Sequence, residues 1–261
     1  MLPLISCLMV TQPLPERLSF LRRSISDYCR QTHPRREMVI VLDVADPSAA
    51  EPVRRILKDY DREDLRLVLP SSKLRLGALR NLSWEAANGD IVCQWDDDDM
   101  NHPERLTCQW DALRGSGKAA CYLEQFMQFF QSERLLYRVN FRPSPERAAV
   151  NTLMAERSLP VRYPESGPDA SLGEDLAILR QIRSGDGFHI LTDEPSLFVY
   201  VSHGANTWHQ GHHRMLVEKM GASEALLRRS EALLRARLSP FDFGSGAVTV
   251  MGRTGPAFVI P

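Results

Sequence analysis

The chain has 261 residues, which at roughly 150 residues per domain accommodates one large domain or two small ones. Hydrophobic residues make up 43% and charged residues 25%, close to the averages of globular proteins, so wholesale disorder, collagen and coiled coil are disfavoured. With 32 Lys+Arg against 33 Asp+Glu, the net charge of -1 provides no pervasive basic field. We therefore expect no nucleic-acid partner.

The cysteines and the N-terminal apolar run indicate the compartment of the protein and its relation to the membrane. Five cysteines without a CxxC pair argue against a disulfide framework and a zinc ribbon, and favour a reducing compartment such as the cytoplasm. The apolar run 2–10 is short and lacks both a basic region before it and a small-residue cleavage site after it, which indicates a buried strand. No stretch reaches the ~20 apolar residues needed to cross a bilayer, so we expect a protein that is soluble or at most peripheral.

Short apolar runs alternate with helical periodicity through the first half of the chain. The pattern predicts strands at 4–10, 38–42, 65–69 and 91–95, and helices at 14–28, 52–60 and 76–86. Such alternation is typical of stacked βα units with a largely parallel sheet.

The second half of the chain is less regular. Strands are expected at 119–130, 135–141 and 197–201, helices at 172–182 and 226–238, and a hairpin around 248–251. The segment 143–168 is rich in turn residues.

The strongest chemical signal is the run Asp96-Asp97-Asp98-Asp99, directly after the predicted strand 91–95. At the carboxyl end of a parallel strand these carboxylates lie where open α/β sheets bind ligands. Alternation along an extended chain would point Asp96 and Asp98 to one side, where two carboxylates suit Mg²⁺ or Mn²⁺ and the phosphates of a nucleotide. The plain alternative is an acidic turn that caps the next helix through Asp99.

Several blocks together resemble a known family. They are residues 4–11, 39–43, 76–81, 87–90 and 95–99 with 103–106, and their order is similar to that of family-two glycosyltransferases of GT-A fold. The resemblance implies an α/β fold with a Rossmann-like, mostly parallel central sheet flanked by helices, a smaller mixed acceptor-side region and a C-terminal helix. We accordingly expect a GT-A domain at 1–210, with a nucleotide-binding half at 1–110 and an acceptor half at 111–210, and a C-terminal helix and tail at 211–261 packed on it.

The resemblance also implies roles for single residues. Thr11 and Asp43 would lie near the nucleobase and ribose, and Arg80 and Asn81 near the nucleotide. The acidic run would be the DXD motif, with Asp96 and Asp97 on the nucleotide sugar, and Asp96 and Asp98 on Mn²⁺ or Mg²⁺. The family usually has two adjacent acids after the second strand, whereas here Val44 follows Asp43. Without the family pattern, Asp43 is explained by an Asx turn, Arg80 and Asn81 by solvent exposure, and Thr11 by the start of a capping segment.

A second acidic pair, Glu174-Asp175, stands where a helix is expected to begin. It resembles the Glu-Asp motif of the family, in which the Asp of inverting members is the general base, so the predicted catalytic residues are Asp175 and Glu174. The alternative is a pair of acids that stabilises the first turn of a helix through its dipole.

Four of the seven histidines cluster in residues 203–213. Some related enzymes have a metal-binding His after the last core strand, which makes His203 a candidate ligand. His209, His212 and His213 have zinc-like HxxH spacing, or belong to a solvated or acceptor-contacting segment. Trp208 is either a platform for a sugar ring or part of the core. The basic helical region 214–238 either docks its leucines on the domain or lies on a membrane surface.

The predicted function is metal-dependent inverting glycosyl transfer, of EC class 2.4, from a nucleotide-diphosphate sugar to a saccharide, a lipid-linked acceptor or another hydroxyl. The alternatives are a Mg²⁺-dependent phosphohydrolase or nucleotidyltransferase, and a non-catalytic module that binds a nucleotide sugar. The expected location is the cytoplasm, and a peripheral contact at the inner membrane face stays open.

Overall fold

The computed structural model describes residues 1–44, 46–185 and 187–261, which form two compact units. Unit 1 comprises residues 1–98, 106–122 and 150–189, and unit 2 comprises residues 99–105, 123–149 and 190–261. The chain passes repeatedly between the two units, so this division differs from the boundaries expected at residues 110 and 210. Each unit is described by itself.

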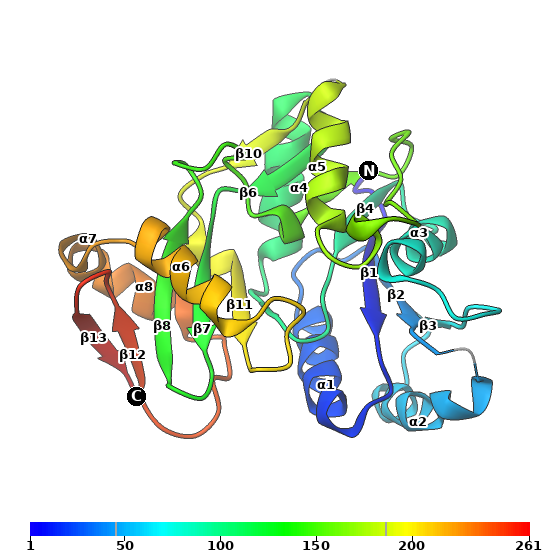
Figure 1. Ribbon diagram of the computed structural model, residues 1–261, viewed down its shortest axis with the longest axis horizontal. Coiled ribbons are helices and arrows are strands. Elements are labelled where there is room, and N and C mark those ends of the chain that lie inside the picture. Colours follow the sequence, from blue (N-terminus) through cyan, green and yellow to red (C-terminus); the bar gives the residue numbers. More distant parts are fainter. Residues whose placement is uncertain (45, 186) are drawn as a thin grey trace. The chain divides into compact units, whose positions relative to one another are not determined.

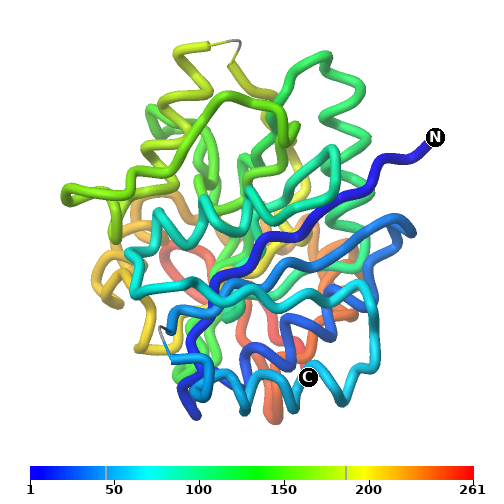
Figure 2. The backbone as a smooth tube through the Cα atoms, turned by 90° about the vertical axis from the view of Figure 1, so that its right-hand side faces the viewer, coloured from blue at the N-terminus to red at the C-terminus, as the bar shows by residue number. Residues whose placement is uncertain are grey.

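The sheet of unit 1 is built on four parallel strands, β1 (Ile5–Thr11), β2 (Arg36–Leu42), β3 (Leu65–Val68) and β4 (Ile91–Gln94). Figure 2 shows the blue trace of β1 beside that of β2. Beyond β4 the sheet continues antiparallel through β9 (Met154–Glu156) to β6 (Ala120–Leu123), and ends at β10 (His189–Leu191). The strand order is β10-β6-β9-β4-β1-β2-β3, so the sheet is mixed.

The helices of unit 1 each bury apolar side chains, and all but α4 were predicted from the sequence. They are α1 (Pro15–Cys29), α2 (Glu51–Tyr60), α3 (Leu76–Ala86), α4 (Arg105–Ser116) and α5 (Glu174–Ser184), with short 3₁₀ turns η1 (Pro47–Ala50), η2 (Val150–Thr152) and η3 (Pro168–Ala170). Figure 1 shows α1, α2 and α3 beside the blue and cyan strands. Leu21 and Ile25 of α1 are fully buried, as expected for positions four apart on one helix face. The predicted helices at 14–28, 52–60 and 76–86 are confirmed within two residues at each end.

Unit 2 contains a second mixed sheet with the order β13-β12-β8-β7-β11-β5. Its strands are β5 (Met100–Asn101), β7 (Gln125–Phe130), β8 (Leu135–Asn140), β11 (Phe198–Ser202), β12 (Val248–Met251) and β13 (Pro256–Ile260). Its helices are α6 (Gln210–Met220), α7 (Glu224–Arg229) and α8 (Glu231–Leu238), preceded by the 3₁₀ turn η4 (Pro195–Leu197). Figure 1 shows α6 across β7 and β8.

The core of unit 2 settles one sequence alternative and corrects two expectations. Leu227, Leu234 and Leu238 pack with Phe129 and Val250, so the leucines of the C-terminal helical region do dock on the sheet. The single helix expected at 226–238 is wrong, because the chain breaks at Ser230 into α7 and α8. The single strand expected at 119–130 is also wrong: β6 and β7 belong to different sheets and separate at buried Glu124. The C-terminal hairpin is confirmed as β12 and β13.

The helix α6, which begins four residues before the expected basic helical region 214–238, buries a histidine against the sheet. His213 is 3% exposed and its ring centroid lies 4.8 Å from that of Tyr200 on β11. Burial lowers the pKa of His213 to about 4, because the charged imidazolium would lose its hydration there.

This burial predicts an acid-sensitive unit 2. The unfolded state takes up a proton near pH 6.5 and the folded state only near pH 4, so stability is complete above pH 6.5 and falls as the pH decreases toward 4. The expected loss from His213 is about 2–3 kcal/mol. Urea unfolding of His213→Leu, compared with the wild type across this range, should show a smaller loss in the variant. Met215→Leu, at an exposed position of the same helix without a titratable group, is the matched control and should retain the wild-type slope.

Candidate active site

The predicted donor-side residues gather at the carboxyl ends of neighbouring parallel strands in unit 1. Thr11 ends β1, Asp43 follows β2, and Asp96 to Asp98 follow β4. Because β4, β1 and β2 are adjacent in the sheet, these residues lie along one edge, where α/β sheets bind ligands. The hydroxyl of Thr11 donates a hydrogen bond to Oδ2 of Asp97 over 2.5 Å.

The acidic run is held by an arginine that sequence analysis missed. Arg17, near the start of α1, donates Nε to Oδ2 of Asp97 over 3.0 Å and Nη2 to Oδ1 of the same carboxylate, and it pairs with Asp98 at 3.0 Å. Burial and the neighbouring charge of Asp98 raise the pKa of Asp97 to about 6, although Arg17 opposes the shift. Arg17 lies in the first turn of α1, which starts a few residues after the end of β1.

The four acids separate differently from the expected alternation. β4 ends at Gln94 and the acids form a bend, so Asp97 and Asp98 share Arg17 while Asp96 faces Arg80. In unit 2, Asp99 accepts a hydrogen bond from the backbone N–H of Val201 over 2.9 Å. Because the backbone is not extended here, a two-residue period does not apply.

Arg80 on α3 lies at the centre of the second group of acids. Its guanidinium contacts Asp96 at 3.2 Å, Glu174 at 3.1 Å and Asp175 at 3.6 Å. Burial alone would lower its pKa, but the charges of Asp175, Asp96 and Glu174 raise it well above the ordinary value. The expectation of a solvent-facing Arg80 is therefore wrong, since its side chain is only 10% exposed.

Glu174 and Asp175 begin α5, as predicted, and Asp175 is strongly perturbed. Burial raises the pKa of Asp175 to about 7, an effect that Arg80 reduces and Glu174 and Asp96 increase. Its Oδ1 is buried and accepts no hydrogen bond, while Oδ2 accepts one from Nε2 of Gln94 over 3.2 Å. The same nitrogen is 3.4 Å from Oδ2 of Asp96. Gln94 thus bridges Asp96 and Asp175. The sequence analysis missed this residue, although a polar side chain within an apolar strand could have indicated it.

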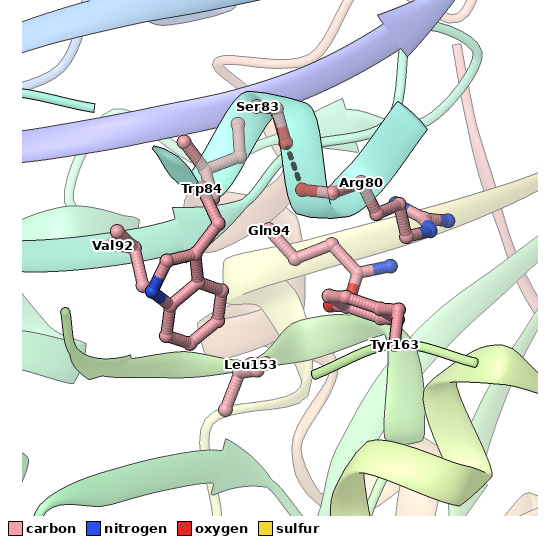
Figure 3. Close-up of a pocket in the computed structure, with 8 residues that line it drawn as sticks. Arg80, Ser83, Trp84, Val92, Gln94, Leu153 and Tyr163 are labelled. Atoms are coloured by element: carbon pink, nitrogen blue, oxygen red, sulfur yellow. Dashed lines mark hydrogen bonds between the residues drawn. The ribbon is translucent and has the colours of Figure 1, made fainter. Parts of the chain in front are cut away.

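A small pocket with room for a water-sized sphere opens beside Gln94. Figure 3 shows Arg80, Gln94 and Tyr163 at one end of this pocket and Trp84, Val92 and Leu153 at the other. The polar end is the side from which Gln94 and Arg80 reach Asp175.

The charges around these strand ends fit a divalent cation. Five carboxylates, those of Asp96, Asp97, Asp98, Glu174 and Asp175, are paired here with the guanidiniums of Arg17 and Arg80. Burial raises the pKa of Asp96, and the charge of Asp98 adds to the effect of burial, so further positive charge would stabilise the ionised forms. Mg²⁺ or Mn²⁺ typically binds one or two carboxylates and completes its shell with water and phosphate. No three His, Cys, Asp or Glu side chains converge on a metal position within the described ranges.

The histidines of unit 2 have other contacts. His203 follows β11, as expected, and its Nδ1 accepts a hydrogen bond from the N–H of Ala205 over 3.3 Å. His209 caps α6 through the N–H of His212. Trp208 is 40% exposed and stacks on His212 with centroids 4.6 Å apart, so the expectation that it belongs to the core is wrong. The HxxH histidines form no three-ligand group in the part of the chain that the structure describes.

Two predicted nucleotide residues are already engaged by protein groups. Oδ2 of Asp43 accepts a hydrogen bond from Nε2 of Gln12 over 2.8 Å, whereas its Oδ1 is buried without such a partner. The amide of Asn81 binds the backbone N–H and C=O of Tyr163 and the carboxylate of Glu165. The side chain of Asn81 on α3 is thus buried against the segment before α5.

Comparison with known proteins identifies the family of the chain. Residues 14–160, more than half of the chain, match the family described as "Glycosyl transferase family 2". The chain belongs to this family. An uncharacterized glycosyltransferase of Methanocaldococcus jannaschii is 34% identical over 116 residues, which covers 44% of this chain and 38% of that protein.

The fold is the GT-A fold of glycosyltransferases. Staphylococcus aureus TarS 1–349 in complex with UDP superposes with a TM-score of 0.58 and 14% identity, over 90% of this family member and 73% of TarS. The Pyrobaculum calidifontis mannosyltransferase PcManGT, in complex with GDP-Man and Mn²⁺, gives 0.58 and 14%, over 92% and 68% of the two chains. At these identities the likeness is one of fold. No helix among the described residues is both long and apolar enough to span a membrane.

The position of Arg80 predicts a large effect on stability. Arg80→Ala leaves three largely buried carboxylates without their shared cation, and we expect the free energy of unfolding to fall by about 3–5 kcal/mol at neutral pH. Arg80→Lys keeps the positive charge but loses the planar guanidinium that binds several carboxylates at once, so it should lower the free energy of unfolding by about half as much. Urea denaturation measures both. Arg75→Ala, at the exposed position just before α3, whose side chain bonds the carbonyl of Gly167, is the control and should change stability by less than about 0.5 kcal/mol.

Proposed function

We propose that this family-two protein transfers a sugar from a nucleotide-diphosphate sugar to an acceptor hydroxyl, with inversion and with a divalent metal ion. The observation that carries the proposal is the joining of the two acidic motifs in unit 1. Gln94 and Arg80 each contact both Asp96 after β4 and Asp175 at the start of α5. The proposed metal-binding carboxylate, Asp96, and the proposed base, Asp175, thereby share two neighbours.

On the donor side, Asp96 and Asp98 would hold Mn²⁺ or Mg²⁺, whose charge would stabilise the departing nucleoside diphosphate. Thr11 and Asp43 at the neighbouring strand ends are the proposed nucleoside contacts, and Arg80 supplies a fixed positive charge beside Asp96. Two proteins of similar fold support a nucleotide sugar as donor. The structure of PcManGT contains GDP-Man and Mn²⁺, and that of TarS, which superposes with a TM-score of 0.56, contains UDP-GlcNAc.

On the acceptor side, Asp175 is the proposed general base. Its buried Oδ1 accepts no hydrogen bond, so it can accept the proton of an incoming hydroxyl, which then attacks the anomeric carbon from the face opposite the leaving group. Burial raises the pKa of Asp175 to about 7, which makes its carboxylate a stronger base than an exposed Asp. Glu174 pairs with Arg80 and is proposed to orient that cation beside the base.

The first prediction from this proposal concerns donor binding. Calorimetry with UDP, GDP and CDP, each with Mn²⁺ or with EDTA, should show metal-dependent binding of one nucleotide. Asp98→Asn should weaken it on the order of 10-fold or more, because even loss of an indirect metal contact costs about that much. Asp90→Asn, an exposed acid before β4, is the matched control and should bind normally. Equal affinity in Mn²⁺ and in EDTA would refute the metal requirement.

The second prediction concerns the base. Asp175→Asn should keep nucleotide affinity but reduce turnover of the nucleotide sugar by about 10²–10⁴-fold. In the wild type, turnover should rise with pH up to about 7 and then level off, since the base acts only when it is ionised. Hydrolysis of the nucleotide sugar, with water as acceptor, measures both effects. A pH-independent wild-type rate across this range would contradict the assignment of Asp175.

A further inference from the structure

The segment that leads to Asp175 has little regular structure to hold it. Between Tyr163 and α5 it contains only the short turn η3, and most of residues 165–169 are exposed. Gly167 and Gly173 adopt left-handed backbone conformations with φ of 79° and 93°. The position of the base therefore depends on contacts with a neighbouring element, and that element is α3.

Asn81 on α3 binds this segment with three hydrogen bonds. Its Oδ1 accepts from the N–H of Tyr163 over 2.9 Å, and its Nδ2 donates to the carbonyl of Tyr163 over 2.9 Å and to Oε1 of Glu165 over 2.8 Å. Asn81 is 5% exposed. Both amide hydrogens are used, so only one lone pair of Oδ1 is left for any ligand.

Gly77, four residues earlier on the same helix face, allows this close approach. A Cβ at position 77 would lie 2.0 Å from the carbonyl oxygen of Pro164 and 3.5 Å from that of Ala170. The segment thus rests directly on the backbone of α3, at a distance that only glycine permits. Arg80, on the next turn, pairs with Glu174 and Asp175 at the end of the segment.

We propose that Asn81 is a positioning residue for Asp175: it fixes the segment 163–173 on α3 and does not contact the nucleotide. This assignment rests on the proposed function, because it needs Asp175 to be the base. It replaces the sequence-based expectation of Asn81 beside the nucleotide. Acting through the segment, Asn81 affects the catalytic step and leaves donor binding unchanged.

The test separates binding from turnover. Asn81→Ala should reduce hydrolysis of the nucleotide sugar about 10–100-fold in kcat, the cost typical of losing an indirect support of an active group, and should change the Kd of the nucleoside diphosphate with Mn²⁺ less than about twofold. In an Asp175→Asn background, the same substitution should have no further effect on turnover, because the two residues act as one unit. Loss of nucleotide affinity with unchanged kcat, or full additivity of the two substitutions, would overturn the proposal.

A reciprocal pair of variants guards against simple misfolding. Asn81→Asp removes both donated hydrogen bonds and places a carboxylate beside Glu165, so turnover should fall. Adding Glu165→Gln reverses donor and acceptor between the two side chains and should recover part of kcat, whereas Glu165→Gln alone should be close to the wild type. No recovery in the double variant would overturn the proposal. A wild type without nucleotide binding or turnover would instead contradict the proposed function itself.

Discussion

The structure of unit 1 depends on one buried cation. Arg80 contacts Asp96, Glu174 and Asp175, which come from two distant parts of the chain. Burial of a carboxylate is costly unless it is paired, and here three carboxylates share one guanidinium. Their arrangement is stable only while α3, the end of β4 and the start of α5 keep their places. Many other features of the site, such as the glycine at position 77 and the amide bonds of Asn81, preserve that arrangement.

The two arginines divide the acids into groups with different character. Arg17 binds Asp97 with two donors and Thr11 adds a third, so three hydrogen bonds hold the carboxylate of Asp97 at the edge of the sheet. Arg80 is shared among three acids and satisfies none of them fully, and Oδ1 of Asp175 accepts no hydrogen bond. Acids that are adjacent in the sequence therefore differ in how fully hydrogen bonds and ion pairs satisfy their carboxylates. The group around Arg80, together with the neighbouring charge of Asp98, keeps the surplus negative charge that the proposed cation and a proton in transit require.

Features that depend on local sequence were predicted correctly, whereas contacts between residues far apart in the chain were missed. Regular apolar periodicity located α1, α2 and α3, because each helix buries one face. Short continuous apolar runs located the parallel strands, of which β1, β2 and β4 are buried on both faces. Family resemblance located Arg80, Asp96 and Asp175, which the structure brings together. Arg17 was missed because its partners are about 80 residues away and nothing in its local sequence differs from a solvent-facing arginine. The break at Ser230 was missed because the leucine pattern continues through it, and the separation of β6 from β7 because both are apolar.

Asn81 shows that two adjacent residues of one sequence motif can have different structural partners. Arg80 and Asn81 are adjacent in one block, and the block alone assigns both of them to the nucleotide. On a helix, consecutive residues point about 100° apart, so neighbours in a motif face different partners. Arg80 reaches the acids, whereas Asn81, on the same face as Gly77, reaches the backbone of Tyr163. The two adjacent residues thus have different contacts: Arg80 compensates the charge of Asp96, Glu174 and Asp175, and Asn81 attaches the segment that leads to Asp175.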